Sequence, residues 1–141
     1  MLPIGGHALL LWFHVLGACT WIGGQLAVAV VVPVLRGEPR LAAALGRRFQ
    51  WVAWPAFLLL VVTGVIQALD DGITPTTLLA TSAGRTLGVK LLFVLLSGTA
   101  ALAHTLTPPS RRSARLSAIL GGLSLLSAVM AALFGVVIAG G

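Results

Sequence analysis

The stretch Trp12–Gly24 reads WFHVLGACTWIGG, and it contains no charged residue. It lies within an apolar run from about Gly6 to Leu35, which exceeds the roughly 20 residues that a helix needs to cross the hydrocarbon core of a bilayer. The same stretch nevertheless carries an imidazole, His14. Because ionisable side chains inside a membrane are costly, they are candidates for function by default. The stretch therefore predicts a membrane-spanning helix that carries a functional side chain.

The composition of the whole chain is that of a membrane protein. Hydrophobic residues make up 58% of the 141 residues and charged residues 9%, whereas about a quarter of a soluble domain is charged. Cutting the chain at its charges and prolines leaves four apolar stretches, at about 6–35, 49–69, 86–106 and 116–139. Helices satisfy their backbone polar groups within the segment, as lipid requires. We therefore predict an all-α fold, with a single transmembrane domain over residues 1–141 that forms a four-helix bundle of up-down-up-down topology.

The basic residues are concentrated in two of the three connections. By the positive-inside rule these connections are cytoplasmic, so both termini are predicted to be extracytoplasmic. The net charge of +6 is thus interpreted as a topology signal, and nucleic acid is not an expected partner. The expected partner is the lipid bilayer, with a homo-oligomer or a larger membrane complex left open. The arginines in question are Arg36, Arg40, Arg47 and Arg48 in the first connection and Arg111, Arg112 and Arg115 in the third.

Small residues at spacings of three or four predict close packing between helices. They include Gly17, Gly23 and Gly24 in the first stretch and Ser97, Gly98, Gly121, Ser124, Ser127 and Ala128 in the last two. The lone Cys19 is expected to be a small packing residue. Trp12, Trp51 and Trp54 are expected in the interfacial belts. Pro33 and Pro55 are expected near cytoplasmic helix ends, where a missing amide costs least.

Seven-residue spacing places the polar side chains of two helices in stripes. The first stripe is His7, His14 and Trp21, and the second is Lys90, Ser97 and His104. Both stripes are expected to face the bundle interior. At 1.5 Å per residue, His14 lies about 9 Å and Lys90 about 6 Å below the outer surface, whereas His104 lies about 27 Å along its helix. His14 and Lys90 therefore share a layer, and His14 and His104 cannot be the two axial ligands of one iron.

Two kinds of cofactor suit this arrangement. A haem could take His14 as its axial ligand, with Lys90 available to a propionate, a substrate or the iron. Copper could use the imidazoles of His7 and His14, which a straight helix holds about 10 Å apart unless the chain before Ala8 folds back. Purely structural roles are the alternative to cofactor binding. Trp21 would fill the core, and Lys90 would extend to the outer headgroups. In the same way, His104 would cap a helix end and His7 would be interfacial.

The sequence also resembles a known family. The runs LWFHVLGACTWIGG, GRRFQWVAWPAFLLLVVTG and GRTLGVKLLFVLL, with a later His104, are similar to four-helix membrane proteins of the copper-resistance D (CopD) type and to the related HemJ-type protoporphyrinogen oxidases. The resemblance implies a multi-pass protein of a bacterial plasma membrane, with His14 and Lys90 as the functional pair. It implies haem b and porphyrinogen oxidation in the HemJ type, and copper as cargo in the CopD type.

Three functions follow as hypotheses. The first is a membrane redox protein that binds haem b through His14, with Trp21 and His104 as further cofactor contacts and Lys90 as the catalytic residue. The second is a copper transport or resistance protein with His14 and His7 as metal ligands. The third is a non-catalytic accessory subunit whose polar residues only pair helices. Whether the protein is an enzyme is left open.

Overall fold

The computed structural model describes residues 5–35, 37–107 and 113–140, and these residues form long helices joined by short connections. The helices are α1 (Gly6–Val34), α2 (Pro39–Asp70), α3 (Ser82–Leu106) and α4 (Ala114–Gly140). Each of these four is long and apolar enough to cross a membrane. The predicted all-α class is confirmed, and the chain is a multi-pass membrane protein. Arg36, Arg111 and Arg112, used above to predict topology, lie outside the described residues.

The main difference from the expected boundaries is in α2. This helix begins at Pro39, about ten residues before the expected start near residue 49. Its first turns are rich in alanine and leucine, which favour helix, and Pro39 at the start has no amide to leave unsatisfied. Cutting the sequence at its charges therefore located the edge of the hydrocarbon core rather than the end of the helix. As a result, Pro55 falls in the middle of α2 and not near its end.

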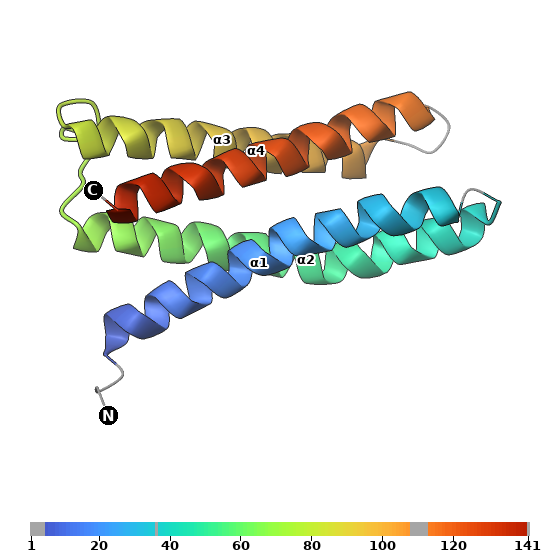
Figure 1. Ribbon diagram of the computed structural model, residues 1–141, viewed down its shortest axis with the longest axis horizontal. Coiled ribbons are helices and arrows are strands. Elements are labelled where there is room, and N and C mark those ends of the chain that lie inside the picture. The colour runs from blue at the N-terminus through green and yellow to red at the C-terminus, as the bar shows by residue number, and fades with distance from the viewer. Residues whose placement is uncertain (1–4, 36, 108–112, 141) are drawn as a thin grey trace. The chain divides into compact units, whose positions relative to one another are not determined.

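The chain divides into two compact units, Met1–Thr74 and Pro75–Gly141. The first unit is a hairpin of α1 and α2, and the second is a hairpin of α3 and α4 (Figure 1). In the first, Gly17 meets Ala56 while the later Gly24 meets the earlier Phe49, so the two helices are antiparallel. The glycine Gly72, at a φ of +72°, follows α2. A left-handed residue just past a helix end is the position that glycine favours.

The α1–α2 interface combines close backbone approach with an aromatic cluster. A methyl group built on Gly17 would lie 3.0 Å from the carbonyl oxygen of Ala56. One turn later Trp21, only 3% exposed, packs against Phe57 and Trp54 with ring centroids 4.6 and 5.8 Å away. Trp54 thus belongs to this cluster, and its expected place in an interfacial belt stays a prediction. The small residue at position 17 lets the helices approach, as predicted, and the aromatic rings fill the space beside it.

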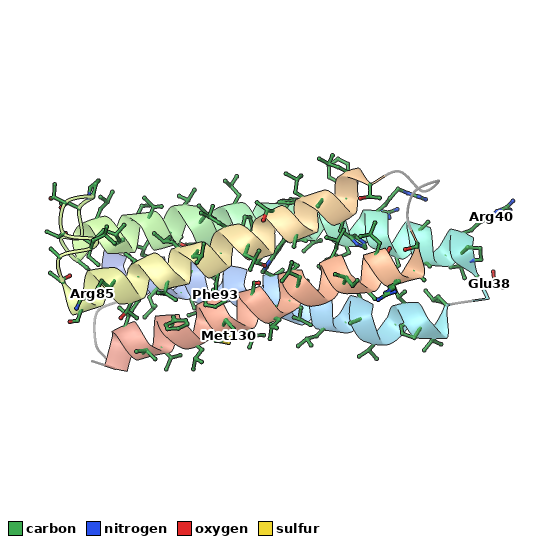
Figure 2. The ribbon with its side chains drawn as sticks, turned by 90° about the horizontal axis from the view of Figure 1, so that it is seen from above. Glu38, Arg40, Arg85, Phe93 and Met130 are labelled. Atoms are coloured by element: carbon green, nitrogen blue, oxygen red, sulfur yellow. The ribbon has the colours of Figure 1, made fainter. Side chains whose placement is uncertain are left out.

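The α3–α4 interface is held by a reciprocal pair of serine hydrogen bonds. The Ser97 hydroxyl donates to the carbonyl oxygen of Ser124 at 2.8 Å, and the Ser124 hydroxyl donates to that of Ser97 at 3.0 Å. Both serines are 1% exposed. Nearby, the rings of Phe93 and Phe134 stack at 5.7 Å between centroids. Figure 2 labels Phe93 on α3 and Met130 on α4, midway along this hairpin. Small polar residues therefore bring these two helices together, as their spacing predicted.

Apolar side chains cover the outer surface of the helices. Examples are Val30, Leu92 and Val136, which are 71%, 64% and 70% exposed. Such a surface is stable against an apolar solvent, so the helices are suited to contact with a lipid bilayer. Cys19 is also exposed, so the expectation that it packs between helices is wrong. Cys19 comes two positions before Trp21, about 200° around the helix, so its side chain lies on the face of α1 opposite the aromatic cluster.

We expect Gly17→Val to lower the free energy of unfolding by about 1–3 kcal/mol, the usual cost of overpacking a tight interface. The new side chain would meet the backbone of Ala56 and of Leu60, whose amide nitrogen is 3.2 Å from the place that a methyl group on Gly17 would take. The control is Gly23→Val on the same helix, where nothing lies within 4 Å. Thermal unfolding in detergent measures both variants. Equal stability of the two would contradict this account of the α1–α2 contact.

Candidate functional site

His14 is anchored to α2 by a hydrogen bond. Its Nδ1 lies 3.0 Å from the hydroxyl oxygen of Thr63, a residue only 4% exposed. The Thr63 hydroxyl in turn donates to the carbonyl oxygen of Leu59 at 2.7 Å, with Leu60 further away at 3.2 Å. A threonine in a helix commonly donates back to the preceding turn in this way. The imidazole of α1 is therefore linked through one hydroxyl to the backbone of α2.

This chain of hydrogen bonds favours one tautomer of His14. A hydroxyl has a single hydrogen, and that of Thr63 is directed to Leu59, its closest acceptor. The Thr63 oxygen therefore accepts a hydrogen bond, and Nδ1 of His14 donates it. In the neutral imidazole the other nitrogen, Nε2, then carries the lone pair. Nε2 is consequently the atom of His14 that can bind a metal or accept a proton.

Gly64 makes the space in which the imidazole lies. A methyl group built on Gly64 would be 3.0 Å from Cε1 of His14 and 3.5 Å from Nδ1. A methyl group at this position would therefore require the ring to shift by a few tenths of an ångström. The neighbours Thr63 and Gly64 thus act together, because one supplies the hydrogen-bond acceptor and the other supplies room.

One turn beyond Thr63, Gln67 adds a polar group to the same face of α2. Its amide nitrogen is buried, and it has no hydrogen-bond partner among the residues that the structure describes. Buried donors in proteins are nearly always paired, with water or a ligand if not with protein. Thr63, which holds His14, and Gln67 therefore give one face of α2 a polar character near its end.

Lys90 occupies the corresponding place in the second hairpin. A methyl group built on Gly135 of α4 would lie 3.2 Å from its ammonium nitrogen and 3.6 Å from Cε. The Lys90 side chain therefore lies across α4 at a glycine, as His14 lies across α2 at Gly64. This placement differs from the alternative in which Lys90 extends straight to the outer headgroups.

His14 and Lys90 also stand at the same position within their helices. Each comes eight residues after the first helical residue, Gly6 or Ser82, which is on the order of 12 Å along the axis. The prediction that the two residues lie in one layer of the bundle rests on this count and stays a prediction. His14 belongs to the first unit and Lys90 to the second, and the prediction that the two side chains face each other stays a prediction.

The remaining predicted site residues have other surroundings. His7 is exposed on α1, two turns before His14, and the continuous helix keeps the two imidazoles too far apart to share one ion. Trp21 packs in the aromatic cluster with Phe57. His104 is half-buried in the last turn of α3. Over the described ranges, no group of three or more histidine, cysteine, aspartate or glutamate side chains could hold a metal ion.

Sequence reasoning missed Thr63, Gly64, Gln67 and Gly135. Threonine and glycine are common in membrane helices, so neither stands out without its partner. The one available signal was the spacing of Thr63 and Gln67, two polar residues four apart in an apolar helix, which share a face. That spacing could have identified the face of α2 that receives a polar side chain, although not which residue of α1 it receives.

Comparison with known families adds one finding. The model of the family described as copper resistance protein D matches residues 43–140, which is more than half of the chain. The matched region includes Thr63, Gly64, Lys90 and His104, whereas His14 precedes it. No curated protein and no solved structure matches the chain.

The predicted shared layer of His14 and Lys90 can be tested by cross-linking. In a Cys19→Ala background, which removes the lone cysteine, we expect the pair His14→Cys and Lys90→Cys to be joined by a short bifunctional thiol reagent. The matched control is His14→Cys with His104→Cys, because His104 lies on the order of 21 Å further along α3 than Lys90. Mobility on a denaturing gel after proteolysis in the second connection detects the link. A link in the control pair alone would refute the layer.

Proposed function

Because the chain belongs to the copper resistance protein D family, and is thus a copper-related membrane protein, we propose that it carries copper at the membrane and that Nε2 of His14 is a copper ligand. The observation that supports this proposal is the hydrogen bond from Nδ1 of His14 to Thr63. Histidines that bind metals almost always donate their other ring N–H to an oxygen, which fixes the ring and makes the ligating nitrogen more basic.

The chemistry of the site suits a cargo rather than a permanently bound ion. Imidazole is a good ligand for copper, and His14 supplies one in a fixed orientation. One imidazole holds an ion more weakly than the sets of three or four ligands found in structural metal sites. Weak binding permits release, which transport through a membrane requires. The buried amide of Gln67 offers a further polar contact on the same face.

A second candidate is haem b, and a different aspect of the same geometry favours it. A porphyrin supplies four nitrogen ligands itself, so a single oriented imidazole such as His14 is sufficient as an axial ligand. When bound, haem would supply one-electron chemistry. Lys90 would serve this candidate as a cation for a propionate, in keeping with its place eight residues into α3. Trp21 and His104 would be further contacts only if the cofactor extended along the helices.

The decisive experiment compares His14→Ala with His7→Ala in detergent-purified protein. We expect the wild type and His7→Ala to bind copper, measured by metal analysis after equilibrium dialysis, and His14→Ala to lose it. His7 is the matched control because it is an exposed imidazole on the same helix. A Soret absorption band that disappears only in His14→Ala would favour haem instead. Copper binding that both variants retain, without a Soret band, would refute the role of His14.

The role of Thr63 gives a second prediction. Thr63→Val removes the acceptor for the Nδ1–H group of His14, so we expect metal affinity to fall by about 10–100-fold, as is usual when such a supporting partner is lost. Thr63→Ser retains the hydroxyl and should restore most of the affinity. Titration with copper measures all three proteins.

Thr99→Val is the matched control for this series. Thr99 is exposed, and its hydroxyl donates to the carbonyl oxygens of Leu95 and Leu96 at 2.8 and 3.2 Å, nearly the geometry of Thr63. It therefore reports the effect of losing a threonine back-bond in a membrane helix without affecting His14. Equal affinity in the two valine variants would show that the Thr63 hydroxyl does not support the ligand.

A further inference from the structure

The N-terminal part of α2 carries a recess of about 370 Å³ that the proposed copper site does not use. It is lined by Ala44, Arg47, Arg48 and Trp51. These four residues follow the spacing i, i+3, i+4 and i+7, so they form one face of a helix. Both arginines are exposed, and Trp51 is 81% exposed. A large aromatic ring and two guanidinium groups are therefore presented together on the surface of the protein.

The length of α2 determines the depth of this recess. Counted back from Asp70 at the end of the helix, about 20 residues cross the hydrocarbon core, which brings the chain to Trp51. Arg47 and Arg48 come three and four residues earlier, so they lie on the order of 5 Å further out. A tryptophan at the edge of the hydrocarbon with arginines just beyond it is the arrangement expected at the level of lipid phosphates.

The charge of the recess indicates the kind of partner. Its lining has two positive charges, and among the described residues it has no carboxylate. Figure 2 labels Glu38 and Arg40 at the start of α2, beyond the recess, where the helix begins. Guanidinium groups bind phosphate through paired N–H donors. The tryptophan N–H can donate to an ester or glycerol oxygen while its ring contacts acyl chains.

We propose that this recess binds the headgroup of an anionic glycerophospholipid, with Arg47 and Arg48 on the phosphate and Trp51 at the glycerol backbone. A basic side chain near an anionic membrane surface contributes about fivefold in affinity. Two arginines should therefore favour an anionic over a zwitterionic lipid by roughly tenfold to thirtyfold. The proposal does not depend on copper or haem, because all four lining residues lie apart from His14 and Thr63.

The test measures lipid binding to the full chain in detergent by native mass spectrometry. We expect phosphatidylglycerol to bind roughly tenfold or more tightly than phosphatidylcholine. In the double variant Arg47→Gln/Arg48→Gln this preference should disappear. The matched control is Arg40→Gln/Arg115→Gln, which removes two positive charges from residues that do not line the recess. This control should keep most of the preference. Thermal unfolding without lipid checks that all variants are folded.

Four outcomes would overturn the proposal. The first is equal affinity for the two lipids, and the second is an equal loss of preference in both double variants, which would indicate general surface charge. In the third, glycerol 3-phosphate alone competes as well as the lipid, which would indicate a site for a free anion. In the fourth, an acidic peptide displaces phosphatidylglycerol at a concentration below the one at which the lipid itself binds, which would indicate a site for protein. Trp51→Leu should weaken lipid binding while leaving competition by glycerol 3-phosphate unchanged.

Discussion

The constraint on which the rest of the structure depends is the cost of an unpaired polar group in hydrocarbon. It requires every spanning segment of the backbone to be helical, and it acts equally on the side chains. Thr63 donates to Leu59, and Ser97 and Ser124 donate to each other's carbonyl oxygens. Each of these hydroxyl groups satisfies its hydrogen in the backbone of a helix. His14 differs in one respect. The hydroxyl of Thr63, whose own hydrogen is bonded to the backbone of α2, accepts the hydrogen bond that orients the imidazole.

The two hairpins hold a polar side chain between their helices in the same way. In each, the residue eight positions into the first helix lies over a glycine near the end of the second, His14 over Gly64 and Lys90 over Gly135. A glycine leaves a depression on a helix surface, so a large side chain can lie flat there without separating the helices. A residue held flat against the neighbouring helix has fewer rotamers available than one that extends along its own helix to the headgroups. Both hairpins therefore limit the motion of their polar side chain by packing rather than by charge pairing.

The sequence was sufficient for the class of fold because composition and run length alone determine whether a chain can span a bilayer. It was insufficient for the start of α2, since a helix continues beyond the hydrocarbon wherever alanine and leucine favour it, as they do after Pro39. It identified His14 and Lys90 because ionisable residues are rare in such runs. It did not identify Thr63 or Gly64, because their role arises only when α1 is placed against α2. Trp21 shows the same limit, since seven-residue spacing gives a shared face but does not tell what covers it.

The position of His14 outside the matched family region has a physical consequence for how the site is built. The family match covers residues 43–140, and it includes the parts of the site that receive a side chain, Thr63 and Gly64. The matched segment thus contains the surface that receives the side chain, and the first helix supplies the imidazole. Since Gly64 leaves room for a ring and Thr63 accepts one hydrogen bond from it, this surface suits a flat ring with an N–H donor, such as an imidazole or an indole. Of these two rings only the imidazole has a second nitrogen with a lone pair, so His14 combines a fit to α2 with a basic nitrogen that an indole would lack.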